Sequence, residues 1–236
     1  CIRDRYRSLA ADSRIRILDK PGEFNFSRLC NHGVAASRGE VYVLLNNDTE
    51  VINADWLSVM VAQALRPDVG AVGAKLYYPD GSIQHGGVVL GIGGVAGHVH
   101  QHLTAGADGY QGRARLTQRM SAVTAACLAG RKNIYQQVGG MDEVNLKVAF
   151  NDVDLCLKLV AKGYAVIWTP AAELYHHESA SRGSDCEPEK AARFSREVAW
   201  VTRQWKKELM ADAAYNRNLS LHMPGYRLDT GPFVRK

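Results

Sequence analysis

The feature that most constrains the fold is an apolar run that ends abruptly in amides and a carboxylate. Residues 41–45 read VYVLL, and Asn46, Asn47 and Asp48 follow at once. A short apolar run closed by Asn and Asp is typical of a strand inside a parallel sheet that is covered on both faces. Ligands of open α/β sheets bind beyond the carboxyl ends of such strands. The run therefore predicts a buried strand that carries polar side chains to a binding site.

Asp48 admits two interpretations. A carboxylate beside amides suits a hard divalent cation held against a diphosphate, because such cations take oxygen ligands and keep substrate phosphates in their shell. The flanking amides can hydrogen-bond sugar hydroxyls. Alternatively, residues 46–48 form an Asx turn after a core strand and have no further role. The motif alone leaves both interpretations open.

Composition places the chain among ordinary globular proteins. Its 236 residues are 46% hydrophobic and 22% charged, enough for one large domain or two small ones. The net charge of +5 mildly favours acidic ligands or an anionic membrane surface, but no dense basic patch with interleaved aromatics points to nucleic acid. The five cysteines are scattered without CxxC spacing, which indicates reduced thiols. Since no apolar run reaches about 18 residues and no signal peptide is evident, we expect a cytoplasmic protein, with peripheral association at the inner face of the plasma membrane left open.

Apolar periodicity predicts an alternation of strands and helices. Strands are expected at residues 14–18, 41–45, 69–76 and 165–170, and helices at residues 26–37, 56–65, 152–162 and 187–210. We expect Asn53 or Asp55 to cap the second of these helices. The order β, α, β, α favours a three-layer α/β/α sandwich around a mixed, mostly parallel sheet.

Residues 79–118 interrupt this alternation with many glycines and four histidines. Residues 91–96 satisfy the GxGxxG/A pattern, but no amphipathic helix and no acidic residue about 20 positions later follow, so we reject a dinucleotide site. His98, His100 and His102 would share one face of a strand, where a metal site competes with a glycine-rich loop or hairpin. We expect a mobile cover or an inserted hairpin near the cleft.

Two further polar clusters follow predicted elements. Asn151 can cap a helix that places Asp152 in its first turn, where the positive helix end keeps a carboxylate ionised. Asp152 is then either a functional carboxylate or one that merely complements the helix dipole. His176 and His177 come just after a strand, a position where histidines are more often structural than ligands.

In their order and spacing these clusters resemble glycosyltransferase family 2 on the GT-A fold, specifically its rhamnosyltransferase-like branch. The resemblance rests on residues 45–50 (LNNDTE), 79–87 (PDGSIQHGG), 124–127 (TAAC), 139–143 (GGMDE), 151–155 (NDVDL) and 176–179 (HHES). It covers most of the chain, except that the family's first two strands, which hold the donor's base and ribose, have no counterpart. A donor site built from this chain alone would therefore be incomplete.

The resemblance implies roles for individual residues. Asp48 matches the last acid of the DxD-type motif that ligates Mg²⁺ or Mn²⁺, and His176 matches the metal-facing histidine, with His177 as the alternative. Asp152 matches the catalytic base, whereas Asn151 stands where the family has Glu. The residues expected to bind substrate are Asn46, Asn47, Thr124, Ala125, Asn151 and Arg182.

The implied function is inverting, metal-dependent transfer of a sugar, with rhamnose as one candidate, from a nucleoside-diphosphate-sugar to a glycan or lipid-linked acceptor in cell-surface polysaccharide synthesis. The implied organisation is one GT-A domain: residues 1–78 on the donor and metal side, 79–118 as the Gly/His-rich insertion, 119–182 as the acceptor and catalytic half, and 183–236 as a C-terminal helix and tail. A non-catalytic sugar- or nucleotide-binding module of a larger glycan-assembly protein is the alternative, favoured by Asn151 and by the lack of a counterpart to the family's first two strands. A nucleotidyltransferase is disfavoured because no glycine-rich, basic phosphate loop lies near the start.

Overall fold

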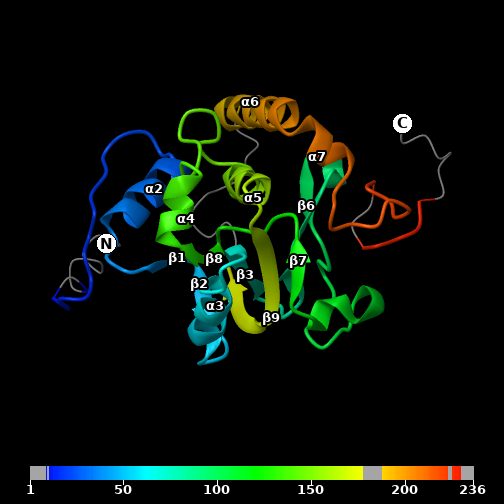
Figure 1. Cartoon of the computed structure of the whole chain (residues 1–236), viewed down its shortest axis with the longest axis horizontal. Helices are drawn as coiled ribbons and strands as arrows, with labels where there is room; N and C mark the ends of the chain where they lie inside the picture. The colour runs from blue at the N-terminus through cyan, green and yellow to red at the C-terminus, as the bar shows by residue number, and fades with distance from the viewer. Residues whose placement is uncertain (1–8, 10, 178–187, 223–224, 230–236) are drawn as a thin grey trace.

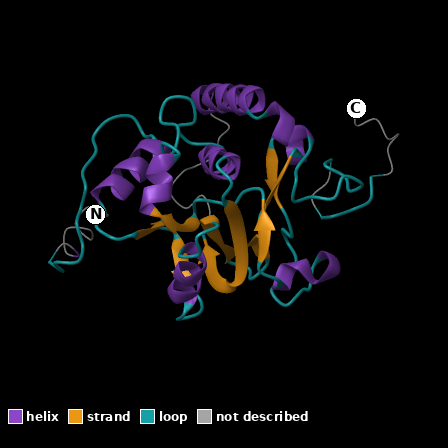
Figure 2. Ribbon diagram, in the orientation of Figure 1, coloured by secondary structure: helices purple, strands orange, loops and turns teal. Residues whose placement is uncertain are grey.

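A computed structural model of the chain describes residues 9, 11–177, 188–222 and 225–229. It shows a central sheet with helices on both faces (Figures 1 and 2), which confirms the three-layer α/β expectation. The helices are α2 (Phe26–Ala36), α3 (Trp56–Ala64), α4 (Lys132–Gln137), α5 (Asn151–Ala161), α6 (Pro188–Gln204) and α7 (Lys206–Met210), with short 3₁₀ helices η1 (Ile92–Gly94) and η2 (Tyr110–Arg115). The strands are β1 (Val41–Leu45), β2 (Thr49–Val51), β3 (Val69–Tyr77), β4 (Ile83–His85), β5 (Val88–Leu90), β6 (Ala96–His98), β7 (Gln118–Met120), β8 (Cys127–Arg131) and β9 (Ala165–His176).

The central sheet is mixed, but it is mostly antiparallel. Its order is β1-β8-β3-β9-β2, with β4 on β3 and β7 on β9. Among the strands of the described residues only β3 and β9 pair in parallel, so the expectation that the sheet is mostly parallel is wrong. The strand–helix–strand unit from β1 through α3 to β3 does give two strands of the same direction. They are not neighbours, because β8 lies between them and runs opposite to both.

Strand β1 lies at the edge of the sheet and not in its interior. It pairs with β8, and within residues 11–177 no strand pairs with its other edge. Its burial alternates accordingly: Tyr42 and Leu44 face the core, whereas Leu45 is 46% exposed. The continuous apolar run suggested a strand covered on both faces, but an edge strand with one half-open face accommodates the same residues.

The two covering layers come from helices on opposite faces. Met60 and Ala64 of α3 are buried against Val72 and Leu76 of β3, while Leu155 of α5 packs in the core cluster on the other face. Helix α6 lies beyond α5 (Figure 1). The expected single C-terminal helix is two helices, α6 and α7, which are separated at Trp205. No helix in the described part of the chain is long and apolar enough to cross a bilayer.

Several local expectations need correction. Residues 14–18 form no strand, since no strand of the described chain forms a β-ladder with them. Asp55 occupies the N-cap position of α3 but its side chain makes no capping hydrogen bond. Asn151 is the first residue of α5, and Phe150, in the left-handed region with φ of 57°, precedes it as the N-cap. Asp152 nevertheless lies in the first helical turn, as predicted.

The Gly/His-rich segment is a hairpin built into the core. Strands β5 and β6 pair antiparallel, with η1 as their turn, and Val88, Val89 and Leu90 of β5 are buried in the main core cluster. Of the two expected alternatives, a mobile cover and an inserted hairpin, the structure has the hairpin. The apolar residues between the glycines supply ordinary packing surface, which places the hairpin in the core. The glycines themselves serve the turn, where Gly91 and Gly93 have positive φ.

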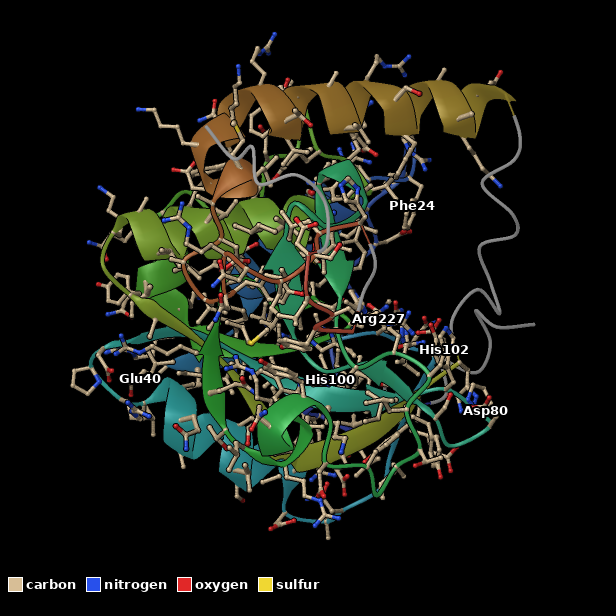
Figure 3. All side chains as sticks on the ribbon, turned by 90° about the vertical axis from the view of Figure 1, so that its right-hand side faces the viewer. Phe24, Glu40, Asp80, His100, His102 and Arg227 are labelled. Carbon is tan, nitrogen blue, oxygen red and sulfur yellow. The ribbon has the colours of Figure 1, made fainter. Side chains whose placement is uncertain are left out.

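The three histidines of this segment do not share a face. His98 ends β6, whereas His100 and His102 have φ values of 63° and 62° and are not in a strand. His100 is buried and stacks on Tyr226, while His102 stacks on Tyr78 and lies toward Asp80 (Figure 3). A metal site of these three imidazoles is therefore excluded in this structure.

We expect the free energy of unfolding to fall as the pH falls from about 6.5 to about 4. Burial, and then the positive charges of Arg113 and Lys75, lowers the pKa of His100 to about 4. In this range the unfolded chain binds a proton that the folded protein excludes, so this histidine alone contributes a slope of up to about 1.4 kcal/mol per pH unit. Burial lowers the pKa of His85 in the same direction. Urea unfolding across this pH range measures the slope.

The control for this prediction is His100→Asn. Asn tolerates the left-handed backbone at this position and does not titrate. The variant should be less stable at pH 7, but its unfolding free energy should depend less steeply on pH than that of the wild type. Equal slopes for the two proteins would contradict the assignment.

Candidate active site

Two strand ladders bring the polar clusters of the sequence to one place. The β1–β8 ladder continues past Leu45, since Asn46 N–H donates to the carbonyl of Ala126 at 2.9 Å. The β2–β9 ladder pairs Thr49 with His176. Residues 46–48, the loop before β8 and the end of β9 therefore meet at one edge of the sheet.

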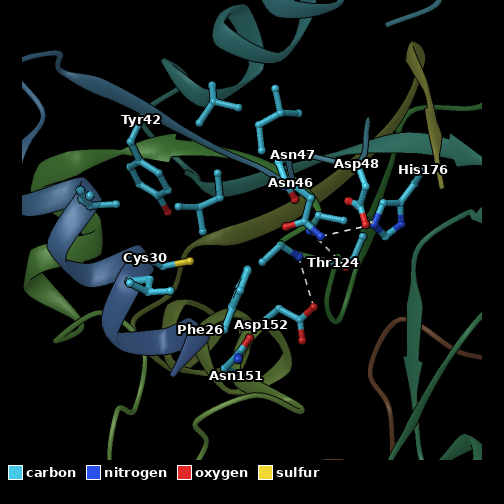
Figure 4. Close-up of a pocket in the computed structure, with 18 of the residues that line it drawn as sticks. Phe26, Cys30, Tyr42, Asn46, Asn47, Asp48, Thr124, Asn151, Asp152 and His176 are labelled. Atoms are coloured by element: carbon cyan, nitrogen blue, oxygen red, sulfur yellow. Dashed lines mark hydrogen bonds and ion pairs between the residues drawn. The ribbon is translucent and has the colours of Figure 1, made fainter. Parts of the chain in front are cut away.

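Asp48 and His176 face each other at this edge. Nε2 of His176 lies 3.2 Å from Oδ1 of Asp48 and 3.3 Å from Nδ2 of Asn46 (Figure 4). Both side chains are largely buried, with 17% of Asp48 and 12% of His176 exposed. Asp48, which follows β1, and His176, which ends β9, thus lie side by side in the structure.

The neighbouring His177 points elsewhere. Its backbone N–H donates to the carbonyl of Asp48 at 2.8 Å, which is a ladder-type contact, and its ring nitrogen lies 3.3 Å from Oε2 of Glu50. Successive residues at a strand end project to opposite faces. Between the two candidates, the geometry therefore favours His176 as the residue that faces Asp48.

The side-chain atoms of Asp48 and His176 fit a hard divalent cation whose coordination shell is completed by a bound ligand. Oδ1 of Asp48 is buried and accepts no hydrogen bond from the described residues, yet it faces an imidazole nitrogen. These two atoms, 3.2 Å apart, are close enough to ligate one Mg²⁺ or Mn²⁺, ions that bind few protein side chains and fill their shell with phosphate oxygens and water. No cluster of three or more His, Cys, Asp or Glu side chains occurs in the described residues, so these residues alone offer a partial coordination sphere.

The loop that contains Thr124 and Ala125 connects this position with Asp152. Ala125 N–H donates to Oδ2 of Asp152 at 3.1 Å, and Oδ1 of Asp152 accepts from Val153 N–H at 2.9 Å. Thr124 turns its hydroxyl back to accept from Ala126 N–H at 3.3 Å. Two backbone donors thus hold the Asp152 carboxylate in place at the start of α5, across the loop from Asp48 (Figure 4).

Asn151 is held differently from Asp152. It is only 3% exposed, and its amide donates to the carbonyl of Val148 at 2.9 Å. The backbone on its N-terminal side is fixed from α6, where the buried carboxylate of Glu197 accepts from Val148 and Ala149 N–H. Through these contacts Asn151 stabilises the backbone at the start of α5, where it lines the cavity.

The polar residues line one cavity of about 990 Å³, which is large enough for a nucleotide-sugar. Its polar end carries Asn46, Asn47, Asp48, Thr124, Asp152 and His176, and its apolar end lies between α2 and β1. The two carboxylates of Asp48 and Asp152 therefore open into the same cleft. Arg182, the remaining expected substrate-binding residue, lies outside the described residues.

The structure adds residues to the site that sequence reasoning did not assign. Gln84 and His98 line the cavity beside His176, and Cys30 lines its apolar end. The PDGSIQHGG stretch belongs to the family pattern, but no local pattern connects it with a histidine about 90 positions later. Burial, and then the nearby charge of Asp152, raises the pKa of the Cys30 thiol to about 12, so Cys30 is not a ready nucleophile.

The chain is similar to known proteins, but it spans less than a quarter of the length of the first two of them. The chain is 56% identical over 220 residues to the uncharacterized protein y4gI of Sinorhizobium fredii, and 41% identical over 179 residues to the O-antigen biosynthesis protein RfbC of Myxococcus xanthus. These matches cover 93% and 75% of this chain but only 24% and 14% of the two relatives. A shorter match, 36% identical over 63 residues, covers 27% of the chain and 20% of an N-acetylglucosaminyl-diphospho-decaprenol L-rhamnosyltransferase of Mycobacterium tuberculosis.

A solved structure supports the fold independently. GalNAc-T7, solved with UDP, GalNAc and Mn²⁺, aligns with 93% of this chain and 43% of its own, with a TM-score of 0.62 at 14% sequence identity. At this identity the likeness concerns the fold alone. It agrees with the GT-A architecture that the sequence motifs imply.

The family model described as "Glycosyl transferase family 2" matches residues 2–139, which is more than half of the chain. The matched region contains the strand β1, Asp48, β4 and the Thr124 loop, all of which contribute to the cleft described above. With the motifs, the fold and the family model in agreement, the chain belongs to glycosyl transferase family 2.

Proposed function

We propose that the cleft transfers a sugar, with inversion, from a nucleoside-diphosphate-sugar to a hydroxyl of a glycan or lipid-linked acceptor. The observation that carries the proposal is that the Asp48–His176 pair and the Asp152 carboxylate line the same cavity on either side of the Thr124 loop. A metal-side pair and a separate carboxylate are the two parts that a single displacement at an anomeric carbon requires.

In the proposed step, Asp152 takes the proton of the acceptor hydroxyl while the hydroxyl oxygen bonds to the anomeric carbon. The bond between that carbon and the diphosphate oxygen breaks, and its electron pair leaves with the diphosphate. A bound Mg²⁺ or Mn²⁺, held by Asp48 and His176, would neutralise charge on the leaving diphosphate. Attack opposite to the leaving group inverts the anomeric configuration, and no covalent nucleophile is needed.

Asn46, Asn47, Thr124 and Ala125 are proposed to contact the donor or acceptor, since they line the cavity between the two carboxylates. Asn151 and Arg182 complete the proposed substrate-binding set. The four-part division into donor side, insertion, acceptor side and C-terminal region is part of the same proposal, although the insertion contributes to the core as well.

The biological setting is proposed from the relatives. The similarity to an O-antigen biosynthesis protein favours cell-surface polysaccharide as the product. Rhamnose is a candidate donor sugar because a short stretch is similar to a rhamnosyltransferase. We propose the cytoplasm as the location, with peripheral contact at the inner face of the plasma membrane, where a lipid-linked acceptor would be reached, and other domains of a longer protein as partners.

The test is a transferase assay on the full natural protein with UDP-, GDP- and dTDP-sugars, Mn²⁺ and a lipid-linked acceptor. We expect one donor to give a glycoside whose anomeric configuration, determined by NMR, is opposite to that of the donor. Retention of configuration would contradict the single displacement. Tight donor binding without transfer or hydrolysis would favour the alternative, a non-catalytic sugar- or nucleotide-binding module.

A further inference from the structure

Gln84 holds both the ring and the backbone of His176. Oε1 of its side-chain amide lies 2.7 Å from Nδ1 of His176, and Nε2 of the same amide donates to the carbonyl of His176 at 3.2 Å. The side chain of Gln84 comes from β4, about 90 positions earlier in the chain, and Gln84 is only 2% exposed. One buried amide thus makes two contacts with a single residue of the site.

The contact of Gln84 with the His176 carbonyl determines which atom of the Gln84 amide faces Nδ1 of His176. Because a carbonyl can only accept, the atom of Gln84 that faces it must be the NH₂ nitrogen, and the atom that faces Nδ1 must be the amide oxygen. That oxygen can only accept, so Nδ1 of His176 carries the proton. In the neutral imidazole this leaves the lone pair on Nε2, the atom that faces Asp48 and Asn46.

The support of Gln84 is itself rigid. All three residues of β4 are buried, and the strand pairs with β3. The carbonyl of Gln84 lies 3.2 Å from Nδ1 of His98. The next residue, His85, is fully buried and accepts from Thr124 N–H at 3.4 Å, so β4 contacts both sides of the cleft.

We propose that Gln84 is a positioning residue that fixes the tautomer and the orientation of His176 so that Nε2 is presented as a metal ligand; this inference rests on the metal-dependent function proposed above. Ligand histidines generally donate their other ring N–H to an acceptor that orients the ring and raises its basicity. The amide oxygen of Gln84 occupies that place for His176.

The test compares two substitutions of nearly equal size. Gln84→Met keeps the length of the side chain but has no strong acceptor, whereas Gln84→Glu keeps an oxygen opposite Nδ1. In the full natural protein, calorimetry with Mn²⁺, alone and with UDP, should show Q84M binding about 10- to 100-fold more weakly than wild type. Q84E should recover most of that loss. Gln101→Met is the matched control, since Gln101 donates to the hydroxyl of Tyr78 away from the cleft and its loss should leave Mn²⁺ affinity unchanged.

A second readout needs no metal. Long-range ¹H–¹⁵N correlation spectra of His176 should show the Nδ1-protonated tautomer in wild type and Q84E, and a shift toward the Nε2-protonated form in Q84M. Protonation on Nε2 in the metal-free wild type would overturn the proposal even if Q84M fails to fold, as would equal Mn²⁺ affinity of folded Q84M and wild type. If the wild type binds no Mn²⁺ with or without UDP, the metal part of the proposed function fails, while the tautomer measurement still decides the role of Gln84.

Discussion

Replacing Asp152 by Asn is expected to lower turnover by about 10² to 10⁴, the usual contribution of a positioned general base. The amide is isosteric, and its oxygen can still accept from the N–H of Ala125 or Val153, so the start of α5 should keep its structure. The amide cannot take a proton from an acceptor hydroxyl. The measurement is transfer under saturating donor and acceptor in the full natural protein, with donor affinity determined separately and expected to be unchanged.

The matched control for Asp152 is Asp55→Asn. Asp55 also lies at the start of a helix, but it is exposed and outside the cleft, so its variant should retain full turnover. Asp154 is unsuitable as a control because it is buried, accepts from Nε1 of Trp205 at 2.9 Å and pairs with Lys158. Equal turnover of wild type and Asp152→Asn would remove Asp152 as the base and favour the binding-module alternative.

Replacing Asp48 by Ala is expected to abolish the coupling between Mn²⁺ and a nucleoside diphosphate. Asp48 supplies the carboxylate of the proposed metal position, so its loss should reduce Mn²⁺ affinity by more than the roughly 100-fold that marks the upper end for outer-shell partners. Calorimetry with UDP or GDP, with and without Mn²⁺, measures the effect. In wild type each ligand should strengthen binding of the other, as reciprocal linkage requires.

Glu50→Ala is the matched control for Asp48→Ala. Glu50 lies in β2, two residues further along the chain, is exposed and contacts His177 on the other side of the strand. Its variant should bind Mn²⁺ and nucleotide as the wild type does. Nucleotide binding that is independent of metal and unchanged in Asp48→Ala would argue strongly against the proposed role of Asp48.

Local sequence patterns predicted the elements of the fold better than their arrangement. Helix α2 and strands β1 and β3 occur close to their expected bounds, because periodic apolar residues decide whether a segment can bury one face. The same patterns gave the wrong sheet. Nothing in residues 41–76 shows that β8 will insert between β1 and β3, since strand neighbours are chosen by long-range packing and not by the strand's own residues.

For the candidate site, too, the residues could be predicted from the sequence but their arrangement could not. Asp48, Asp152 and His176 could be chosen from the sequence, because each stands where a strand ends or a helix begins and because their order matches a family pattern. The sequence does not show that these residues converge on one site, that His176 and not His177 faces Asp48, or that Gln84 contacts His176. These depend on strand register, and a shift of one residue would exchange the faces on which His176 and His177 lie.

The residue types in the sequence specify which chemistry is available here: carboxylates that bind cations or take protons, imidazoles that ligate metals, and amides that hydrogen-bond sugars. Which of these side chains act together depends on the packing of the folded chain. The β1–β8 and β2–β9 ladders and the start of α5 bring residues from four separate segments to one cavity, which no local pattern specifies. Hydrophobic burial and backbone hydrogen bonding select one packing of the whole chain, and the geometry of the site is a consequence of that packing.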